Sequence, residues 1–277
     1  MRSHDRPLYN IVYIYLTYLN VAKIISIVIR KGGVGKTTTA VNLASALQVR
    51  GYKTLLVDLD PQANATISVG INPRTLPHSI NDIFKDINAK ARDIIIKTDY
   101  GLSLLPANRD LSKTEAGMTA TSTKALKPII DEVMNDYDYI ILDTMPSQSY
   151  LSINALVASD SVLVPMETHY LAMEGLEDAM RDISEVKEGL NTNLEIIGIL
   201  PTKVQPGTNL AKAVLEEVQE KYPTLLLPIQ IKLSIKIAEA SLNGVPIVIS
   251  DPTHQGAIDY FTLAQHIYER PQGEIKR

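Results

Sequence analysis

The sequence predicts an α/β fold: a doubly wound, mostly parallel sheet with helices on both faces. Nearly continuous apolar runs of strand length recur along the chain, and segments of helical periodicity separate them. Runs that are apolar without alternation are typical of strands covered on both faces. Strands that alternate with helices in this way form parallel sheets with right-handed crossovers.

The individual elements follow from the same two patterns. Strands are expected over 24–29, 52–58, 102–106, 137–144, 161–165 and 194–200. Helices are expected over 39–50, 123–135, 208–221 and 256–268, because apolar residues there recur every three or four positions. Either Thr208 or Asn209 is the expected N-cap of the third of these helices.

Composition limits the classes of protein that fit. The chain has 277 residues, of which 45% are hydrophobic and 21% charged, as is usual for a globular protein with a sizeable core. It has no cysteine, which excludes disulfides, iron–sulfur clusters and cysteine-ligated zinc. The formal net charge is −4, so any contact with nucleic acid must come from a local patch or from assembly.

The chain divides into one domain and two short end segments. We expect a single domain over 22–270, a polar tail over 271–277 and an N-terminal extension over 1–21. The apolar stretch of this extension, 8–19, is too short and too polar for a membrane span, which needs about 20 apolar residues, and the extension lacks the cleavage pattern of a secretory signal. It is interpreted as a lineage-specific addition or as the product of an upstream start site. N-terminal sequencing of the native protein separates the two.

The clearest local signal is a glycine-rich loop over 31–38. It follows the first predicted strand and precedes the first predicted helix, which is the context of a phosphate-binding loop. Glycines let backbone N–H groups converge, and a helix N-terminus adds further unpaired N–H groups. Lys36 is expected to reach the β- and γ-phosphates, and the Thr37 hydroxyl to ligate Mg²⁺. The predicted nucleotide contacts are Lys31, Gly32, Gly33, Val34, Gly35, Lys36, Thr37 and Thr38.

This loop departs from the pattern G-x-x-x-x-G-K-[ST] at one position. Arg30 stands where the first glycine is expected, and a second lysine, Lys31, follows it. The resulting K-G-G-x-G-K-[ST] loop resembles the deviant Walker A loop of the ParA/MinD ATPases. The resemblance implies an ATP hydrolase with ATP and Mg²⁺ at this site. It also implies a homodimer in which Lys31 crosses the interface to the nucleotide of the other subunit.

Acidic residues follow two of the predicted strands. Ligands of open parallel sheets bind beyond the carboxyl ends of strands, so we expect these acids beside the phosphates. The run Asp58-Leu59-Asp60-Pro61-Gln62 resembles the second signature of the ParA family. The alternative is that Asp58 and Asp60 are simply two acidic residues in a solvated turn. The resemblance implies that Asp60 orients the attacking water, with Gln62 near the nucleotide and Asp58 in support.

A third acid completes the predicted metal site. Asp143 ends the apolar run 137–144 in the Walker B arrangement, in which the carboxylate holds Mg²⁺. The predicted metal-binding residues are therefore Thr37, Asp60 and Asp143. Met145 replaces the first of two prolines that usually follow in this family.

Two further sets of residues come from the resemblance alone. Residues flanking the adenine are expected after the strand 194–200 and within 231–247; they are Thr202, Lys203, Lys232 and Ser234. Candidate DNA contacts are Lys203, Lys212, Lys232 and Lys236, the last of which matches an arginine that relatives use against DNA phosphate. The alternative is that these lysines lie on solvated surfaces beside glutamates such as Glu216. Contacts to phosphate alone would give salt-sensitive, sequence-independent binding.

The resemblance extends over about 22–268, and it implies a ParA-type ATPase of plasmid or chromosome partition. Such a protein binds DNA non-specifically as an ATP-driven dimer and is released when a ParB-like centromere-binding partner stimulates hydrolysis. It is expected in the cytoplasm on the nucleoid, without a membrane contact. Lys31, Lys36 and Asp60 are the expected catalytic residues, acting by positioning and electrostatics.

Two other functions remain as alternatives. A MinD-like membrane-surface positioning ATPase would end in a basic amphipathic helix, whereas the last predicted helix carries Asp259 and adjoins Glu269. A scaffold that binds nucleotide without significant hydrolysis would be expected to have lost part of the set Lys36, Thr37, Asp60 and Asp143, and all four residues are present.

Overall fold

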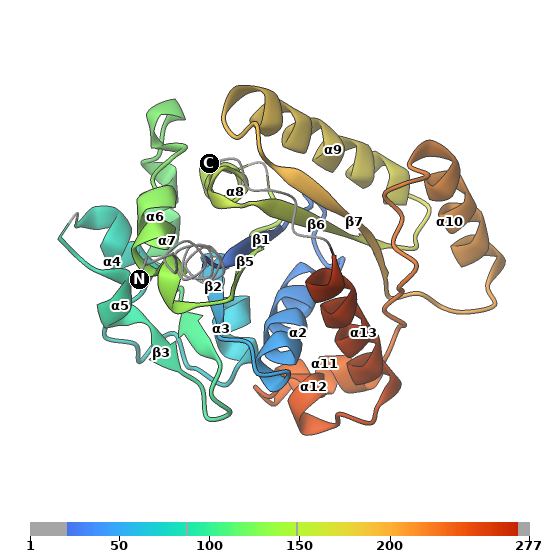
Figure 1. Ribbon diagram of the computed structural model, residues 1–277, viewed down its shortest axis with the longest axis horizontal. Coiled ribbons are helices and arrows are strands. Elements are labelled where there is room, and N and C mark those ends of the chain that lie inside the picture. Colours follow the sequence, from blue (N-terminus) through green and yellow to red (C-terminus); the bar gives the residue numbers. More distant parts are fainter. Residues whose placement is uncertain (1–20, 87, 148, 271–277) are drawn as a thin grey trace, which may run out of the picture.

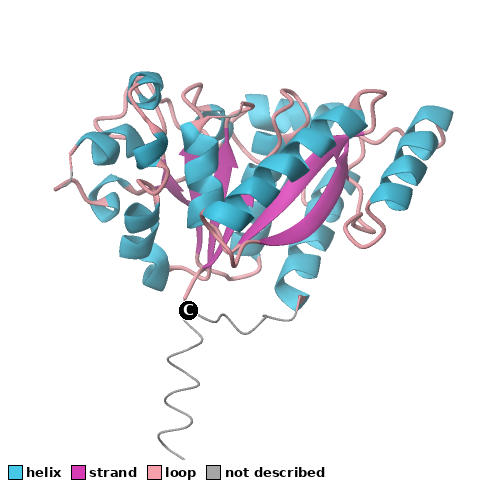
Figure 2. Cartoon of the chain, turned by 90° about the horizontal axis from the view of Figure 1, so that it is seen from above, coloured by secondary structure: helices cyan, strands magenta, loops and turns pink. Residues whose placement is uncertain are grey.

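The predicted α/β architecture is confirmed by the computed structural model, which describes residues 21–86, 88–147 and 149–270. Its sheet has seven strands in the order β3-β4-β2-β5-β1-β6-β7. Neighbouring strands are parallel except for β3 and β4, which are antiparallel. Figures 1 and 2 show the sheet between two layers of helices, as a doubly wound fold requires.

The strands match the predicted ranges closely. They are β1 (Lys23–Ile27), β2 (Thr54–Leu59), β3 (Ile96–Lys97), β4 (Ser103–Leu105), β5 (Tyr139–Thr144), β6 (Ser161–Glu167) and β7 (Glu195–Thr202). β1 ends at Ile27, two residues earlier than predicted, and the first bend toward the glycine-rich loop is at Arg30. The edge strand β3 was not predicted, since two residues are too few to show a periodicity.

The predicted helices 39–50, 208–221 and 256–268 are confirmed, whereas the longest described helix, over 172–189, was not among the ranges predicted from periodicity. The α-helices are α2 (Lys36–Val49), α3 (Asn64–Ser68), α4 (Ile80–Lys85), α5 (Ala91–Ile94), α6 (Leu111–Ala116), α7 (Lys127–Val133), α8 (Tyr150–Ala158), α9 (Ala172–Gly189), α10 (Asn209–Lys221), α11 (Ile235–Leu242), α12 (Ile247–Ser250) and α13 (Gln255–Glu269). The predicted helix 123–135 is in fact α7 followed by a 3₁₀ turn, η2 (Met134–Asp136), and a separate 3₁₀ turn, η1 (Ala120–Ser122), precedes it. Pro128 lies in the first turn of α7, where a missing N–H costs nothing.

The core lies on both faces of the sheet. Along β1, Ile25 belongs to the cluster that includes α2 and α13, whereas Ile24 belongs to the cluster that includes α7 and α8. A third cluster joins β6 and β7 to α9 and α10. Apolar residues at successive strand positions are buried on opposite sides, which explains why the strands have uninterrupted apolar sequences.

The register of the central strands brings the predicted site together. Asp143 of β5 pairs in register with Ile27 of β1 on one side and with Asp58 of β2 on the other. The glycine-rich loop and both carboxylates therefore lie at the same edge of the sheet. Thr208 caps α10 as predicted, its hydroxyl accepting from Ala211 N at 3.3 Å.

The predicted end segments lie almost wholly outside the described residues. Of the extension 1–21 only Val21 is described, and none of the tail 271–277 is. Among the described residues, no helix has both the length and the apolar character needed to cross a membrane.

Candidate active site

The loop between β1 and α2 has the backbone of a phosphate cradle. Gly33 and Gly35 have φ angles of 76° and 91°, a region that residues with a side chain rarely adopt. Gly35 is the N-cap of α2, and Thr39 N is the first N–H of the helix to donate back, to Gly35 O at 2.8 Å. The N–H groups of 36–38 thus have no partner within the helix, and they are free to bind phosphate oxygens.

Lys36 is held inside this loop. Its side chain is buried, and Nζ donates to the carbonyl oxygen of Lys31 at 2.9 Å. Burial lowers the pKa of Lys36 to about 8, although the carboxylates of Asp143 and Asp60 raise it in part. The ammonium group therefore rests on a backbone carbonyl of its own loop, and a phosphate would offer it a stronger, charged partner.

Asp143 has the properties of a metal ligand. It is fully buried, and neither carboxylate oxygen has a hydrogen-bond partner among the described residues. Burial is the main cause that raises the pKa of Asp143 well above its usual value, and the nearby Asp58 adds to the shift; Thr37 and Lys36 act in the opposite direction. A buried carboxylate without partners is costly. A divalent cation between Asp143 and the Thr37 hydroxyl would supply the missing charge, so these residues fit Mg²⁺.

Asp58 and Asp60 have different roles. Asp58 accepts three hydrogen bonds: from Asp60 N at 3.0 Å, from Thr66 N at 2.8 Å and from Thr66 Oγ1 at 2.7 Å. Burial raises the pKa of Asp58 to about 6, and these bonds oppose the shift. With both oxygens engaged, Asp58 fixes the turn that carries Asp60, which agrees with its expected supporting role. Thr66 was missed, because nothing in the sequence marks it.

Asp60 lies at the centre of the site. It is 4% exposed, and its Oδ1 accepts from Gln62 N at 2.8 Å. Its charge acts on both Lys36 and Asp143, so the structure brings it close to the loop and to the metal ligand. Gln62 itself is exposed, and its predicted contact with the nucleotide stays a prediction.

Two threonines at strand ends donate to the backbone, one to the loop itself and one to the end of β1, which leads into the loop. Thr202, at the end of β7, donates from Oγ1 to Val34 O at 2.7 Å. Thr144, at the end of β5, donates from Oγ1 to Ile27 O at 2.7 Å. Thr202 was predicted beside the adenine, and the structure shows that its hydroxyl is used to hold the phosphate loop. Thr144 was not predicted as part of the site.

The other residues predicted near the adenine lie together beside β7. Val204 N donates to Ile231 O at 3.0 Å and Leu233 N donates to Val204 O at 2.9 Å, which brings the segments of Lys203 and Lys232 side by side. Ser234 caps α11, where its hydroxyl accepts from Lys236 N at 3.2 Å. Side-chain contacts from these residues to a base stay a prediction.

The candidate DNA lysines are mostly paired within the chain. Lys203 lies 3.7 Å from Glu167, Lys212 lies 3.8 Å from Glu216 and Lys236 lies 2.9 Å from Glu239. Lys232 alone of the four has no ion pair among the described residues. Exposed pairs of this kind contribute little stability, about 0–1 kcal/mol, so competing phosphates could displace them.

Comparison with known proteins identifies the family. A family model described as an AAA domain matches residues 22–196. The chain is 40% identical over 248 residues to the sporulation initiation inhibitor protein Soj of Bacillus subtilis, a match that covers 88% of this chain and 98% of that protein. It is 33% identical to the chromosome partitioning protein ParA of Caulobacter vibrioides, over 91% of this chain and 96% of ParA. The chain belongs to the ParA/Soj family of P-loop ATPases.

A solved structure supports the chemistry of the site. The crystal structure of cobyrinic acid a,c-diamide synthase from Mycobacterium smegmatis, with bound ATP analogue and magnesium, aligns with a TM-score of 0.79. The two sequences are 33% identical, and the match covers 90% of this chain and 95% of that one. The ParA/Soj ATPase described here is an ATP hydrolase, and its site serves ATP with Mg²⁺.

Proposed function

We propose that this ATPase drives the partition of DNA, plasmid or chromosome. ATP brings two copies into a face-to-face dimer, in which each Lys31 reaches the nucleotide of the other subunit. The dimer binds DNA without sequence preference. A ParB-like centromere-binding partner stimulates hydrolysis, which separates the dimer and releases the DNA. The protein acts in the cytoplasm, on the nucleoid.

The observation that carries this proposal is the contrast between the two lysines of the loop. Lys36 is buried, and its ammonium group is bound inside its own subunit. The side chain of Lys31 is partly exposed and lies beside Gly175 of α9, and it makes no ion pair with the described residues of its own subunit. A cation without a partner in its own subunit is available to a nucleotide in another. The similarity to the chromosome partitioning protein ParA of Caulobacter vibrioides, over 96% of that protein, supports the partition role.

The residues of the site support hydrolysis by positioning and electrostatics. Lys36 and Lys31 would neutralise the phosphates, and Asp60 would orient the attacking water. Thr37 and Asp143, with Asp60 beside them, would hold Mg²⁺, which when bound neutralises charge on the β- and γ-phosphates. A general base with a raised pKa is not required, because phosphoryl transfer depends chiefly on positioning.

The DNA contacts of the proposal are Lys203, Lys212, Lys232 and Lys236. The ion pairs of Lys203, Lys212 and Lys236 are exposed or partly exposed, so phosphate groups can replace the glutamates at little cost. The net charge of −4 means that a single copy attracts DNA weakly, and joining two copies doubles the local basic surface. DNA binding is therefore expected to depend on ATP and to weaken as salt increases.

The deciding experiment measures DNA binding by the full chain with ADP, with ATP, and with ATP plus Lys31→Ala, at two salt concentrations. Lys53→Ala is the matched control, because Lys53 directly precedes β2 and so lies at the amino-terminal ends of the strands, away from the loop. We expect binding only with ATP, weaker binding at the higher salt, and loss of binding in Lys31→Ala but not in Lys53→Ala. An absence of binding with every nucleotide would overturn the DNA part of the proposal.

The MinD-like alternative is not favoured by the last described helix. Tyr260, Leu263 and Ile267 of α13 are buried in the core cluster that includes α2, so the apolar face of this helix is already covered. An amphipathic membrane helix needs that face for the lipid. Flotation with anionic vesicles in the presence of ATP tests this alternative directly, and co-flotation of the protein would restore it.

A further inference from the structure

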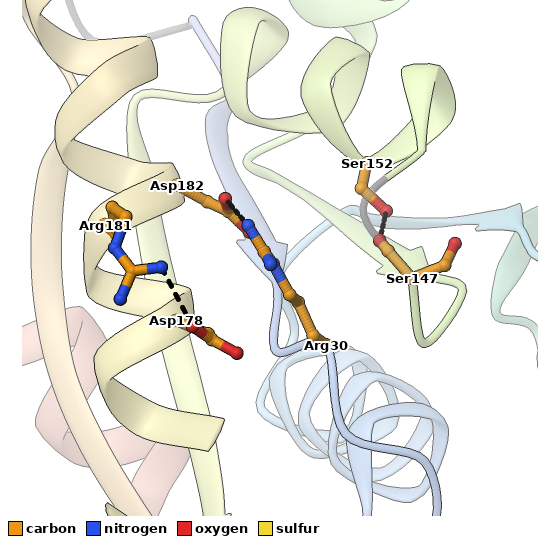
Figure 3. Close-up of polar contacts among 6 residues, drawn as sticks. All are labelled: Arg30, Ser147, Ser152, Asp178, Arg181 and Asp182. Atoms are coloured by element: carbon orange, nitrogen blue, oxygen red, sulfur yellow. Dashed lines mark hydrogen bonds and ion pairs between the residues drawn. The ribbon is translucent and has the colours of Figure 1, made fainter. Parts of the chain in front are cut away.

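An ion pair links the start of the phosphate loop to a helix far along the chain. Arg30 stands where the loop pattern has its first glycine, and it contacts Asp182 of α9 (Figure 3). Arg30 Nε donates to Asp182 Oδ2 at 2.6 Å, and Nη2 donates to Oδ1 in a second, parallel contact. The side chains are 27% and 14% exposed. A two-point contact of this kind fixes orientation as well as distance.

Lys31, the residue after Arg30, packs against the same helix, α9. The aliphatic part of Lys31 rests against Gly175, where an added methyl group would lie 3.6 Å from Lys31 Cβ and 3.8 Å from Cδ. Positions 175, 178, 182 and 185 recur every three or four residues and therefore share one side of α9. Asp178 and Glu185 on this side add to the attraction for Arg30, while Asp178 is itself paired with Arg181 at 3.1 Å.

The segment of Arg30 and Lys31, which packs against α9, also holds the side chain of Lys36 in place. The carbonyl oxygen of Lys31 accepts the hydrogen bond from Lys36 Nζ at 2.9 Å. The backbone of Lys31 thus lies between two fixed points, the Arg30–Asp182 pair and the ammonium group of Lys36. Arg30 and Asp182 also border a pocket of about 130 Å³, whose lining combines apolar residues such as Ile153 and Leu156 with three serines and Glu185.

We propose that Arg30 and Asp182 form a positioning pair for Lys31, which holds the start of the loop on α9 so that the Lys31 side chain is directed toward the partner subunit. This inference rests on the proposed function, because it gives the pair a role in the ATP-driven dimer. Without the pair the loop entry would sample more orientations, and forming the dimer would have to restrict them again at an entropic cost.

The test combines the pair with Lys31. The variants are Asp182→Asn, Arg30→Gln and the charge-exchanged double variant Arg30→Asp with Asp182→Arg, each prepared with and without Lys31→Ala. Glu177→Gln is the matched control, since it removes an exposed ion pair between α9 and Lys221 of α10 without touching the loop. The readouts are ATP-dependent dimerisation by analytical ultracentrifugation, ADP affinity, and thermal unfolding.

The expected results separate a positioning role from a structural one. Dimerisation should weaken about tenfold in Arg30→Gln and in Asp182→Asn, a usual size for coupling through a contact, while ADP affinity stays within about twofold. In the Lys31→Ala background the same changes should have no further effect, because the residue they position is gone. The charge-exchanged variant should recover part of the dimerisation, and Glu177→Gln should leave it unchanged.

Three results would overturn the inference, and only the third of them would also refute the proposed function. Normal dimerisation in Arg30→Gln and Asp182→Asn, with Lys31→Ala defective, refutes the positioning pair alone. If the pair variants weaken dimerisation further in the Lys31→Ala background, and if this loss parallels a lower melting temperature, the pair has only a structural role. Normal dimerisation in Lys31→Ala would instead refute the cross-subunit lysine of the proposed function, and the inference with it.

Discussion

The depressed pKa of Lys36 leads to a measurable pH dependence of nucleotide binding. In the nucleotide-free fold, burial lowers this pKa from 10.5 to about 8. Phosphate binding favours the charged ammonium form, so the pKa rises again in the complex. Affinity that depends on the ammonium is therefore fully present below about pH 8, and it is lost as the pH rises through that value.

The size of the effect follows from the fraction of charged Lys36. With a pKa of about 8, roughly nine tenths of the free protein carries the charge at pH 7 and about one tenth at pH 9. ADP affinity should therefore fall about tenfold between these values, or about 1.4 kcal/mol. Binding is measured without Mg²⁺, so that the metal ligands do not contribute, and the phosphates of ADP are already ionised over most of this range.

Titration calorimetry in two buffers of different ionisation enthalpy provides the assay. Near pH 9 the protein should take up close to one proton for each ADP bound. Lys36→Arg is the control, because a guanidinium stays charged throughout and should give a flat profile wherever binding survives. A flat profile in the unmodified protein would refute the reasoning, as would an equal slope in Lys36→Arg.

Three further predictions test the surroundings of the site. Asp143→Asn should abolish phosphate release yet raise the unfolding free energy of the nucleotide-free protein by about 1–2 kcal/mol. The stability gained by Asp143→Asn should grow with pH, because the raised pKa of Asp143 means that ionising its carboxyl group destabilises the folded state. A lower unfolding free energy of the variant in denaturant titrations would contradict this prediction. Thr202→Val should weaken ADP binding severalfold, since a hydrogen bond of about 1 kcal/mol to the loop is lost; unchanged affinity by calorimetry argues against it. Gly198→Ala should lower the unfolding free energy by about 1–3 kcal/mol, because its Cβ would lie 2.7 Å from the Leu225 carbonyl oxygen. Gly189→Ala, with nothing within 4 Å, is the control, and equal melting temperatures would refute the clash.

The sequence by itself determined the class of fold and the centre of the site. Apolar runs such as β5 are buried on both faces, and a chain that alternates such strands with helices has few other ways to cover them. Parallel strands end at one edge, so a loop after the first strand and acids after two others had to meet there. Lys36, Asp60 and Asp143 could be placed together for this reason, without knowledge of any long-range contact.

Only the tertiary structure decided which residues hold that centre in place. Thr202 and Val34 are 168 positions apart, and Arg30 and Asp182 are 152 apart. They meet because β6 and β7 follow β1 in the sheet, an order that no local pattern encodes. The pairing of Lys203 with Glu167 across the ends of β7 and β6 likewise needed the folded chain. Residues that bind phosphate carry a local signature because a single loop supplies them, whereas the residues that support this loop come from distant elements and do not.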